Sequence, residues 1–288
     1  MTGNCAGRES GQVVRPTAAP GSEQRAAKGY GDAKLIGHIE DPQITESSGL
    51  VTADTTRASY WTHNDSGGEA LLFCLESRGD SCGTWTVTGA DALDWEDIAR
   101  GPGPSKGTTY LFVGDIGDNQ EDRAFVSVYA IPEPSPTGSD GATQPATTLT
   151  FTYPDGSHDA ETLLVHPVSG DLYIVTKGAE PAVYAARSPL ASGPLELVGP
   201  APEPGALPGP TGGDISPNGR RVIFATYTGA IEIRLRKGKR FDSIWNRSPR
   251  AISFPFEQRE AIGFSPSGTS VLTTSEGENA PIYKVTRR

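Results

Sequence analysis

Three short segments of the chain repeat one pattern, in which a glutamate is followed by a polar or small residue and then by an aliphatic run. They are Glu96-Asp97-Ile98, Glu161-Thr162-Leu163 and Glu260-Ala261-Ile262. Two degenerate copies, Ser48-Gly49-Leu50 and Gly213-Asp214-Ile215, complete a set of five whose members lie 47 to 65 residues apart. A period of about 40–50 residues is typical of chains built from repeated four-stranded sheets. The pattern therefore predicts five such units.

Strand patterns follow each copy at matching offsets, with turns at residues 168–170, 217–219 and 266–268 in the last three copies. The chain ends at Arg288 after only three strands of the last copy, whereas a surplus strand at Lys34 to Ile39 precedes the first. Pairing the surplus strand with the incomplete sheet would close a ring and remove the exposed sheet edges. We therefore expect an all-β fold, a five-bladed β-propeller over residues 33–288 whose last blade is closed by the N-terminal strand.

Residues 1–32 are rich in Gly, Ala, Ser, Arg and Pro, show no strand pattern, and are predicted to form a flexible leader. Cys5 lies where a lipid-anchored bacterial protein carries its modified cysteine, although the residues before it do not match the usual recognition sequence. Cys74 and Cys82 flank a turn. They form either a hairpin disulfide, which would indicate an oxidising compartment, or two independent thiols. We expect a secreted or cell-envelope protein.

The chain is acidic, with a formal net charge of −10. This charge argues against a surface for nucleic acid or anionic membrane and fits cation binding, while the alternative is that it serves solubility alone. No segment reaches the roughly 18 uninterrupted apolar residues of a membrane span. The basic run at residues 234–240 is typical of a solvated strand and turn, with an anionic partner or substrate as the alternative. We expect a monomer that binds a small anionic molecule.

In a propeller the innermost strands line a central channel, and the loops that enter them share one mouth with the loops joining second and third strands. Carboxylates crowded at that mouth cannot all stay ionised without a cation. Oxygen ligands favour Ca²⁺, and no His/Cys spacing favours zinc. We therefore predict one Ca²⁺ on the axis, held by Ser48, Glu96, Glu161 and Glu260. If the repeat is aligned one residue out of phase, Asp97 and Asp214 would instead replace Glu96 and Gly213 around the axis. Without a metal, the glutamates would accept backbone hydrogen bonds from the next blade.

The same loops supply candidates for catalysis and substrate binding. A general base is expected among Asp65, Asp115, His158 and Glu276, and an anionic group is expected to contact His63, Lys177, Tyr227 and Arg259. Residues 115–119 lack the spacing of an EF-hand, and an Asx-rich turn is favoured there over a second calcium site. The chain contains no phosphate-binding Gly-rich loop, no nucleophile-elbow serine and no zinc-protease motif.

The mouth pattern of serine, glutamate, glutamate, a small residue and glutamate, together with residues 93–99 and 111–117, resembles the calcium-activated nucleotidase (apyrase) family of propellers. The resemblance implies a central Ca²⁺ that organises nucleotide diphosphate hydrolysis, with Ser48, Glu96, Glu161 and Glu260 at the ligand positions. Gly213 departs from the pattern because it has no side-chain ligand, and no residues match the nucleotide pocket of that family. The element at residues 95–99 is also similar to secreted bacterial propellers grouped as phytase-like or esterase-like.

Three classes of function follow from these residues. The first is a calcium-dependent hydrolase in which the ion polarises a phosphoryl or acyl oxygen. The second is a non-catalytic propeller that binds a ligand or protein, with calcium only structural. The third is a metal-free glycosidase, or an unusual lyase or cyclase, that uses the mouth carboxylates as acid and base. Metal content separates the third class from the others, and loss of activity on chelation separates the first from the second.

Overall fold

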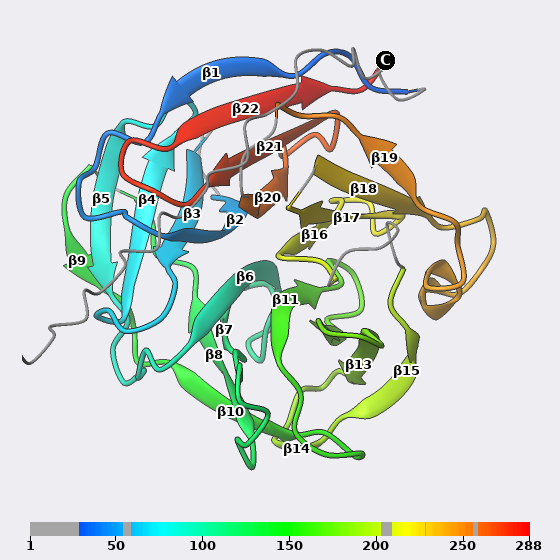
Figure 1. Cartoon of the computed structure of the whole chain (residues 1–288). Helices are drawn as coiled ribbons and strands as arrows, with labels where there is room; N and C mark the ends of the chain where they lie inside the picture. The colour runs from blue at the N-terminus through cyan, green and yellow to red at the C-terminus, as the bar shows by residue number, and fades with distance from the viewer. Residues whose placement is uncertain (1–28, 54–58, 137, 203–208, 228, 256–258) are drawn as a thin grey trace, which may run out of the picture.

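The computed structural model describes residues 29–53, 59–136, 138–202, 209–227, 229–255 and 259–288. These residues form five mainly antiparallel sheets arranged around a common centre (Figure 1). The predicted five-bladed β-propeller is therefore confirmed. Cys5 and most of the predicted leader lie outside the described residues. Within the described part, no helix has the length and apolarity needed to cross a membrane.

Each blade begins in the chain with its innermost strand and continues outward. Blade 1 contains β2 (Ser47–Thr52), β3 (Ser59–Asn64), β4 (Leu71–Glu76), β5 (Ser81–Thr86) and the short β9 (Gly141–Ala142). Blade 2 contains β6 (Trp95–Pro102), β7 (Thr109–Asp115), β8 (Val126–Pro132), β10 (Thr147–Thr152) and the short β14 (Gly193–Pro194). Blade 3 contains β11 (Ala160–Val165), β12 (Leu172–Thr176), β13 (Ala182–Ala186) and β15 (Glu196–Pro200).

The last two blades have four strands each. Blade 4 contains β16 (Gly213–Ile215), β17 (Arg221–Thr226), β18 (Gly229–Arg234) and β19 (Arg250–Ile252), with the 3₁₀ helix η1 (Phe241–Ile244) between β18 and β19. Blade 5 contains β20 (Arg259–Phe264), β21 (Ser270–Ser275), β22 (Pro281–Thr286) and β1 (Lys34–His38).

The ring is closed by the N-terminal strand, as the strand count predicts. β1 lies antiparallel to β22 on the outside of blade 5, with Lys34 opposite Lys284 (Figure 1). Just before β1, Tyr30 is 4 % exposed, and its hydroxyl donates a 2.6 Å hydrogen bond to the Glu232 carboxylate of blade 4. Tyr30, which falls within the predicted leader, therefore packs on the propeller and links its last two blades.

Two short strands cover the outer edges of blades 1 and 2. β9 leaves blade 2 and pairs in parallel with β5, while β14 leaves blade 3 and pairs in parallel with β10. An uncovered edge strand exposes unpaired backbone groups to other chains. The insertions that lengthen these blades therefore protect the edge of the preceding blade.

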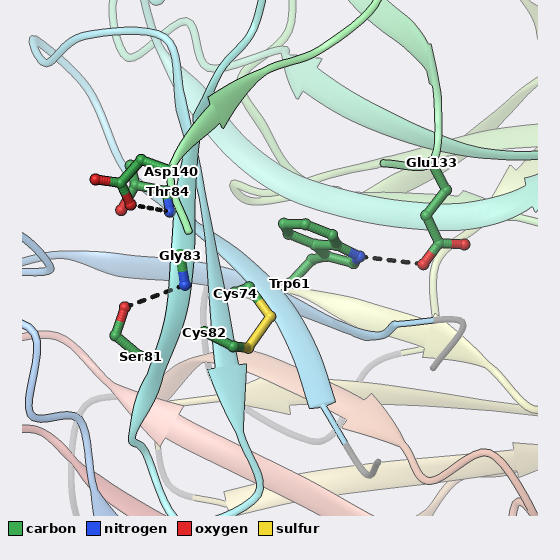
Figure 2. Close-up of a disulfide and its surroundings, with 8 residues drawn as sticks. All are labelled: Trp61, Cys74, Ser81, Cys82, Gly83, Thr84, Glu133 and Asp140. Carbon is green, nitrogen blue, oxygen red and sulfur yellow. Dashed lines mark hydrogen bonds between the residues drawn. A yellow bond between two sulfur atoms is a disulfide. The ribbon is translucent and has the colours of Figure 1, made fainter. Parts of the chain in front are cut away.

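The blades pack face to face through apolar side chains. Between blades 1 and 2, Trp61 and Trp85 meet edge to face at 5.0 Å and belong to one buried cluster with Trp95 and Ile98. The Trp61 indole also donates a 3.1 Å hydrogen bond to Glu133 (Figure 2). Burying one such large side chain contributes about 1.5–3 kcal/mol. These clusters fix the positions of the innermost strands.

Cys74 and Cys82 form a disulfide across β4 and β5, with their Cα atoms 5.0 Å apart (Figure 2). Cys74 lies opposite Gly83, and Cys82 is the extra residue of a β-bulge between Ser81 and Gly83. The hairpin-disulfide prediction is therefore confirmed, and the bulge explains how two residues that are not direct cross-strand partners come together.

Candidate metal centre at the channel mouth

Each glutamate of the repeat is the extra residue of a β-bulge at the start of an innermost strand. In β6 the residues on either side of Glu96 pair with β7, whereas Glu96 has no partner in the register. Glu161 in β11 and Glu260 in β20 occupy the same place. Because a bulge re-aims the side chain that it carries, the three carboxylates gather at one end of the channel. All three residues are buried.

In blades 1 and 4, the residue that occupies the position of the glutamates is one residue away from the one that the sequence repeat indicates. The pairing of β2 with β3 and the hydrogen bonds of Ala225 align Gly49 and Gly212 with the glutamates, and not Ser48 and Gly213. The sequence alignment of these two copies is thus corrected. The Ser48 hydroxyl donates a hydrogen bond to the backbone carbonyl of Glu96. Ser48 therefore holds the backbone of a glutamate, whereas its predicted role was to bind metal.

Further carboxylates converge on the glutamates from neighbouring loops. Oxygens of Asp65, Asp94 and Glu96 all lie within 4.8 Å of one another, and so do oxygens of Asp65, Glu260 and Glu276. Asp65 belongs to both groups. Asp94, which the sequence analysis did not single out, directly precedes the Trp95-Glu96 pair in the best copy of the repeat. Its position in a motif already recognised was the only available signal.

The electrostatics of the mouth carboxylates are unfavourable without a cation. Burial, followed by the charges of Asp65, Glu161 and Asp94, raises the pKa of Glu96 to about 10. Burial and the neighbouring Glu260 raise the pKa of Glu276 to about 8, and burial is the main cause that raises the pKa of Asp65 to about 6. At neutral pH Glu96 and Glu276 therefore retain protons that a bound cation would displace.

Glu161 is held by a neighbouring cation, Lys177. The Lys177 ammonium forms ion pairs with Glu161 and with Asp159, the second at 3.2 Å. Burial lowers the pKa of Lys177, but the two carboxylates outweigh burial and raise it. The residue is 8 % exposed, and its other oxygen, Oε2, is buried without a hydrogen-bond partner. Burial raises the pKa of Glu161 to about 7. This orphaned oxygen is a free acceptor for a cation.

Gly117 allows two of the carboxylates to approach each other. A Cβ atom at this position would lie 2.3 Å from Glu96 Oε1 and 2.4 Å from Asp94 Oδ2. Any side chain would therefore displace both groups, and the glycine leaves the space that they occupy.

Asp97, the residue after Glu96, links the innermost strands of blades 2, 3 and 4. Its carboxylate accepts backbone hydrogen bonds from Ile98, from Leu163 of blade 3 at 2.9 Å and from Gly213 of blade 4 at 3.1 Å. Asp214 accepts a 2.7 Å bond from the Phe264 backbone. Both carboxylates of the out-of-phase alternative are thus engaged by backbone N–H groups.

The other predicted residues divide between the mouth and the interior. Tyr227 is half-buried at the mouth, where burial followed by the Glu161 charge raises its pKa to about 12. His63 is fully buried edge-on against Trp95, and burial lowers its pKa to about 4. Arg259 is 1 % exposed. Its guanidinium lies over the rings of Phe254 and Tyr283 between the last two blades.

Asp115 and the turn that follows form a local structural unit. Asp115 pairs with Arg123 at 2.8 Å, and Asp118 accepts backbone hydrogen bonds from Asp122 and Arg123. Asp118 thus closes a turn over residues 118–123, which overlaps the Asx-rich turn favoured for residues 115–119. His158 does not belong to the groups of mouth carboxylates. Its Nε2 atom lies 3.0 Å from Asp155 Oδ1 and 3.0 Å from the Tyr184 hydroxyl. It borders a groove of about 760 Å³ beside the mouth that is also lined by Lys177, Tyr184 and Leu197.

The donor set suits a hard divalent cation. Ca²⁺ accepts about 6–8 oxygens at roughly 2.3–2.6 Å in flexible geometry, and the mouth offers carboxylates from several loops with an orphaned oxygen beside them. In both groups of converging ligand atoms, every donor is a carboxylate oxygen. The residues present therefore fit calcium.

The chain is similar in fold to solved structures with which it shares little sequence identity. No protein-family model and no curated protein sequence matches the chain. Among solved structures, a gluconolactonase from Xanthomonas campestris is similar over 92 % of this chain and 99 % of its own, with 13 % identity and a TM-score of 0.47. The hydrazine synthase of Kuenenia stuttgartiensis is similar over 81 % of this chain and 56 % of its own, with 14 % identity and a TM-score of 0.42. Neither similarity bears on the activity of this chain.

Proposed function

We propose that the chain is a calcium-dependent hydrolase that acts on a small molecule with an anionic phosphoryl or acyl group. The observation that carries this proposal is the convergence of two carboxylate groups on Asp65, with oxygens within 4.8 Å, beside the orphaned oxygen of Glu161. On this geometry Asp65, Glu96 and Glu260 are the main ligands, supported by Asp94, Glu161 and Glu276.

The ion, when bound, would polarise a substrate oxygen and lower the pKa of a water molecule. The chain's own residues would supply the rest of the chemistry. The partly buried Glu276 carboxylate can accept a proton from that water molecule and return it. The Tyr227 hydroxyl can donate a hydrogen bond to a substrate oxygen, and Lys177 can pair with an anionic group between the carboxylates and the His158 groove. His63, Asp115 and Arg259 are buried in the walls, and we assign them no substrate contact.

The disulfide supports maturation of this protein outside the cytosol, because such bonds persist in oxidising compartments. We therefore propose a secreted or cell-envelope location. Extracellular calcium is abundant enough for a site of moderate affinity.

Calorimetric titration of the metal-free chain with CaCl₂ tests the metal centre. We expect saturable binding, and a hundredfold excess of calcium over Kd should stabilise the fold by about 2.7 kcal/mol. Asp65→Asn should abolish both effects because Asp65 belongs to both carboxylate groups. The matched control is Glu278→Gln, an exposed carboxylate on the same face outside those groups. A melting temperature that is indifferent to calcium and to chelator would contradict the proposal.

The hydrolase activity is tested separately with a panel of phosphate esters, nucleoside diphosphates, carboxylic esters and lactones. Activity that disappears with chelator and returns with calcium supports the proposal. Calcium binding without turnover of any compound would favour the non-catalytic alternative, and turnover in chelator would favour metal-free acid and base catalysis.

A further inference from the structure

The loops at the two ends of the propeller carry opposite charge. Because consecutive strands run in opposite directions, loops that enter the innermost strands or join second to third strands lie at the mouth. Loops that join first to second or third to fourth strands lie at the opposite end, together with the start of β1 and the C-terminus. The mouth loops are acidic, with Glu46, Asp65, Glu69, Asp94, Glu276 and Glu278 among them.

The opposite end of blades 4 and 5 presents a basic surface. It consists of exposed cationic side chains between β18 and η1 and at the end of β22, namely Arg236, Lys237, Lys239, Arg240, Arg287 and Arg288. None of the six forms an ion pair with another described residue. The two parts of this surface are continuous, because Tyr30 bonds to Glu232 of β18 and bridges to Arg287.

The basic surface acts independently of the net negative charge. Strands of about six residues at roughly 3.3 Å per residue separate the two ends by about 20 Å. The Debye length at physiological salt is about 8 Å. Charges at the mouth are therefore largely screened from a partner at the opposite end, and the total of −10 does not describe what that partner meets.

An exposed apolar side chain lies beside the basic loop. Val168, in the turn between β11 and β12, is 76 % exposed. Its neighbour His166 contacts the ring of Phe241 in η1 at 4.5 Å, which places this turn next to the basic residues that precede η1. Exposed aliphatic groups among cations suit the boundary between headgroups and acyl chains of a bilayer.

We propose that the basic surface binds anionic phospholipid headgroups and orients the acidic mouth away from the membrane. The leader does not offer a complementary occupant, because residues 1–28 carry four basic and two acidic residues and so add positive charge. Gly29, where the described chain begins, accepts a 2.9 Å backbone hydrogen bond from Arg288. The leader thus joins the propeller at the same surface. Each basic residue near an anionic leaflet contributes about 1 kcal/mol.

Vesicle co-sedimentation of the full chain tests this proposal. Vesicles of phosphatidylcholine alone are compared with vesicles containing about 30 mol % phosphatidylglycerol, at about 50 mM and about 300 mM salt. EDTA is present so that calcium cannot bridge the acidic mouth to lipid. We expect binding only to the anionic vesicles at the lower salt. Absence of binding there would overturn the proposal.

Matched double variants then locate the surface. Lys237→Gln with Lys239→Gln should weaken partitioning about 30-fold. Arg78→Gln with Lys106→Gln removes the same charge from exposed positions of blades 1 and 2 outside the basic surface and should change partitioning less than about threefold. Equal losses in both variants would indicate a diffuse charge effect and overturn the assignment. Binding to duplex DNA without binding to anionic vesicles would assign the surface to nucleic acid and also overturn it.

Discussion

Blades 2, 3 and 5 place a glutamate in the bulge of the innermost strand, whereas blades 1 and 4 place a glycine at the same position. The difference lies in what fills the adjoining space. A Cβ atom on Gly49 would lie 2.6 Å from the backbone nitrogen of Ile98, and one on Gly212 would lie 2.3 Å from the carbonyl oxygen of Glu260. The glycine blades are thus packed tightly against the backbone of the glutamate blade that follows each of them.

The hydroxyl residue before each glycine strengthens this arrangement. Ser48 of blade 1 donates to the carbonyl of Glu96 in blade 2, and Thr211 of blade 4 donates to the carbonyl of Arg259, which precedes Glu260 in blade 5. The bulge at the start of the innermost strand therefore has two roles. In three blades it directs a carboxylate to the mouth, and in two blades it positions the next blade's carboxylate.

The largest effect that tests this comparison is the pH dependence of the metal-free fold. The pKa values of Glu96, Glu161 and Glu276 are about 10, 7 and 8, above the unfolded value of 4.5. The folded state therefore holds more protons than the unfolded state, and stability is lost as pH rises through the folded pKa values. Glu96 alone should lower the free energy of unfolding by about 4 kcal/mol between about pH 5 and about pH 8.

Urea unfolding in EDTA across this pH range measures the effect. Calcium should reduce the loss because it binds the ionised carboxylates. Stability that increases towards about pH 8 in EDTA would show that the glutamates are not crowded in the metal-free fold.

The glycine blades are tested by Gly49→Ala. The residue has a φ of 71°, which disfavours an L side chain, and the added Cβ would collide with blade 2. We expect a loss of about 3–4 kcal/mol in the free energy of unfolding. Gly89→Ala is the control, since Gly89 has a φ of 81° but nothing within 4 Å of the added Cβ, and should cost about 1–2 kcal/mol. Equal losses would mean that blade packing has no part in the choice of glycine.

The glutamate blades are tested by Glu96→Gln, which should have the opposite sign. Glutamine has the shape of the protonated acid and is neutral at any pH. Folding of the variant therefore does not require a carboxylate that is ionised in the unfolded chain to take up a proton, and the free energy of unfolding of the metal-free protein at about pH 7 should rise by about 3 kcal/mol. The same substitution should remove most of the calcium-induced increase in melting temperature. Differential scanning calorimetry with and without calcium measures both, and a variant that is less stable in EDTA would contradict the electrostatic description.

The smallest effect concerns the hydroxyls. Ser48→Ala should cost about 1 kcal/mol because it leaves the buried Glu96 carbonyl without this donor. Thr211→Val should have a similar effect on stability. Because both residues position a neighbouring glutamate, each variant should also weaken calcium binding several-fold in calorimetric titration. Unchanged affinity in both would limit the hydroxyls to a purely structural role.

The sequence by itself determined the number of blades, the closing strand and the three glutamates. These follow from chain-local patterns, since repeat period, turn residues and strand alternation are properties of neighbouring residues. The strand Lys34 to Ile39 could be assigned to the last blade because only that pairing completes five sheets. Cys74 and Cys82 could be identified as a candidate pair, but whether they join depends on a bulge at Cys82, which the sequence pattern does not reveal.

Tertiary structure alone decided the phase of the repeat and the composition of the mouth. Aligning copies by their aliphatic residues placed Ser48 and Gly213 beside the glutamates, whereas cross-strand pairing selects Gly49 and Gly212. Asp94 and Glu96 meet Asp65 because the segment that enters β6 and the loop between β3 and β4 come to one place, and no interval in the chain encodes that meeting. The charge segregation behind the basic surface is likewise a property of strand direction and not of composition. A net charge sums over all residues, while a binding partner meets only those within about a Debye length.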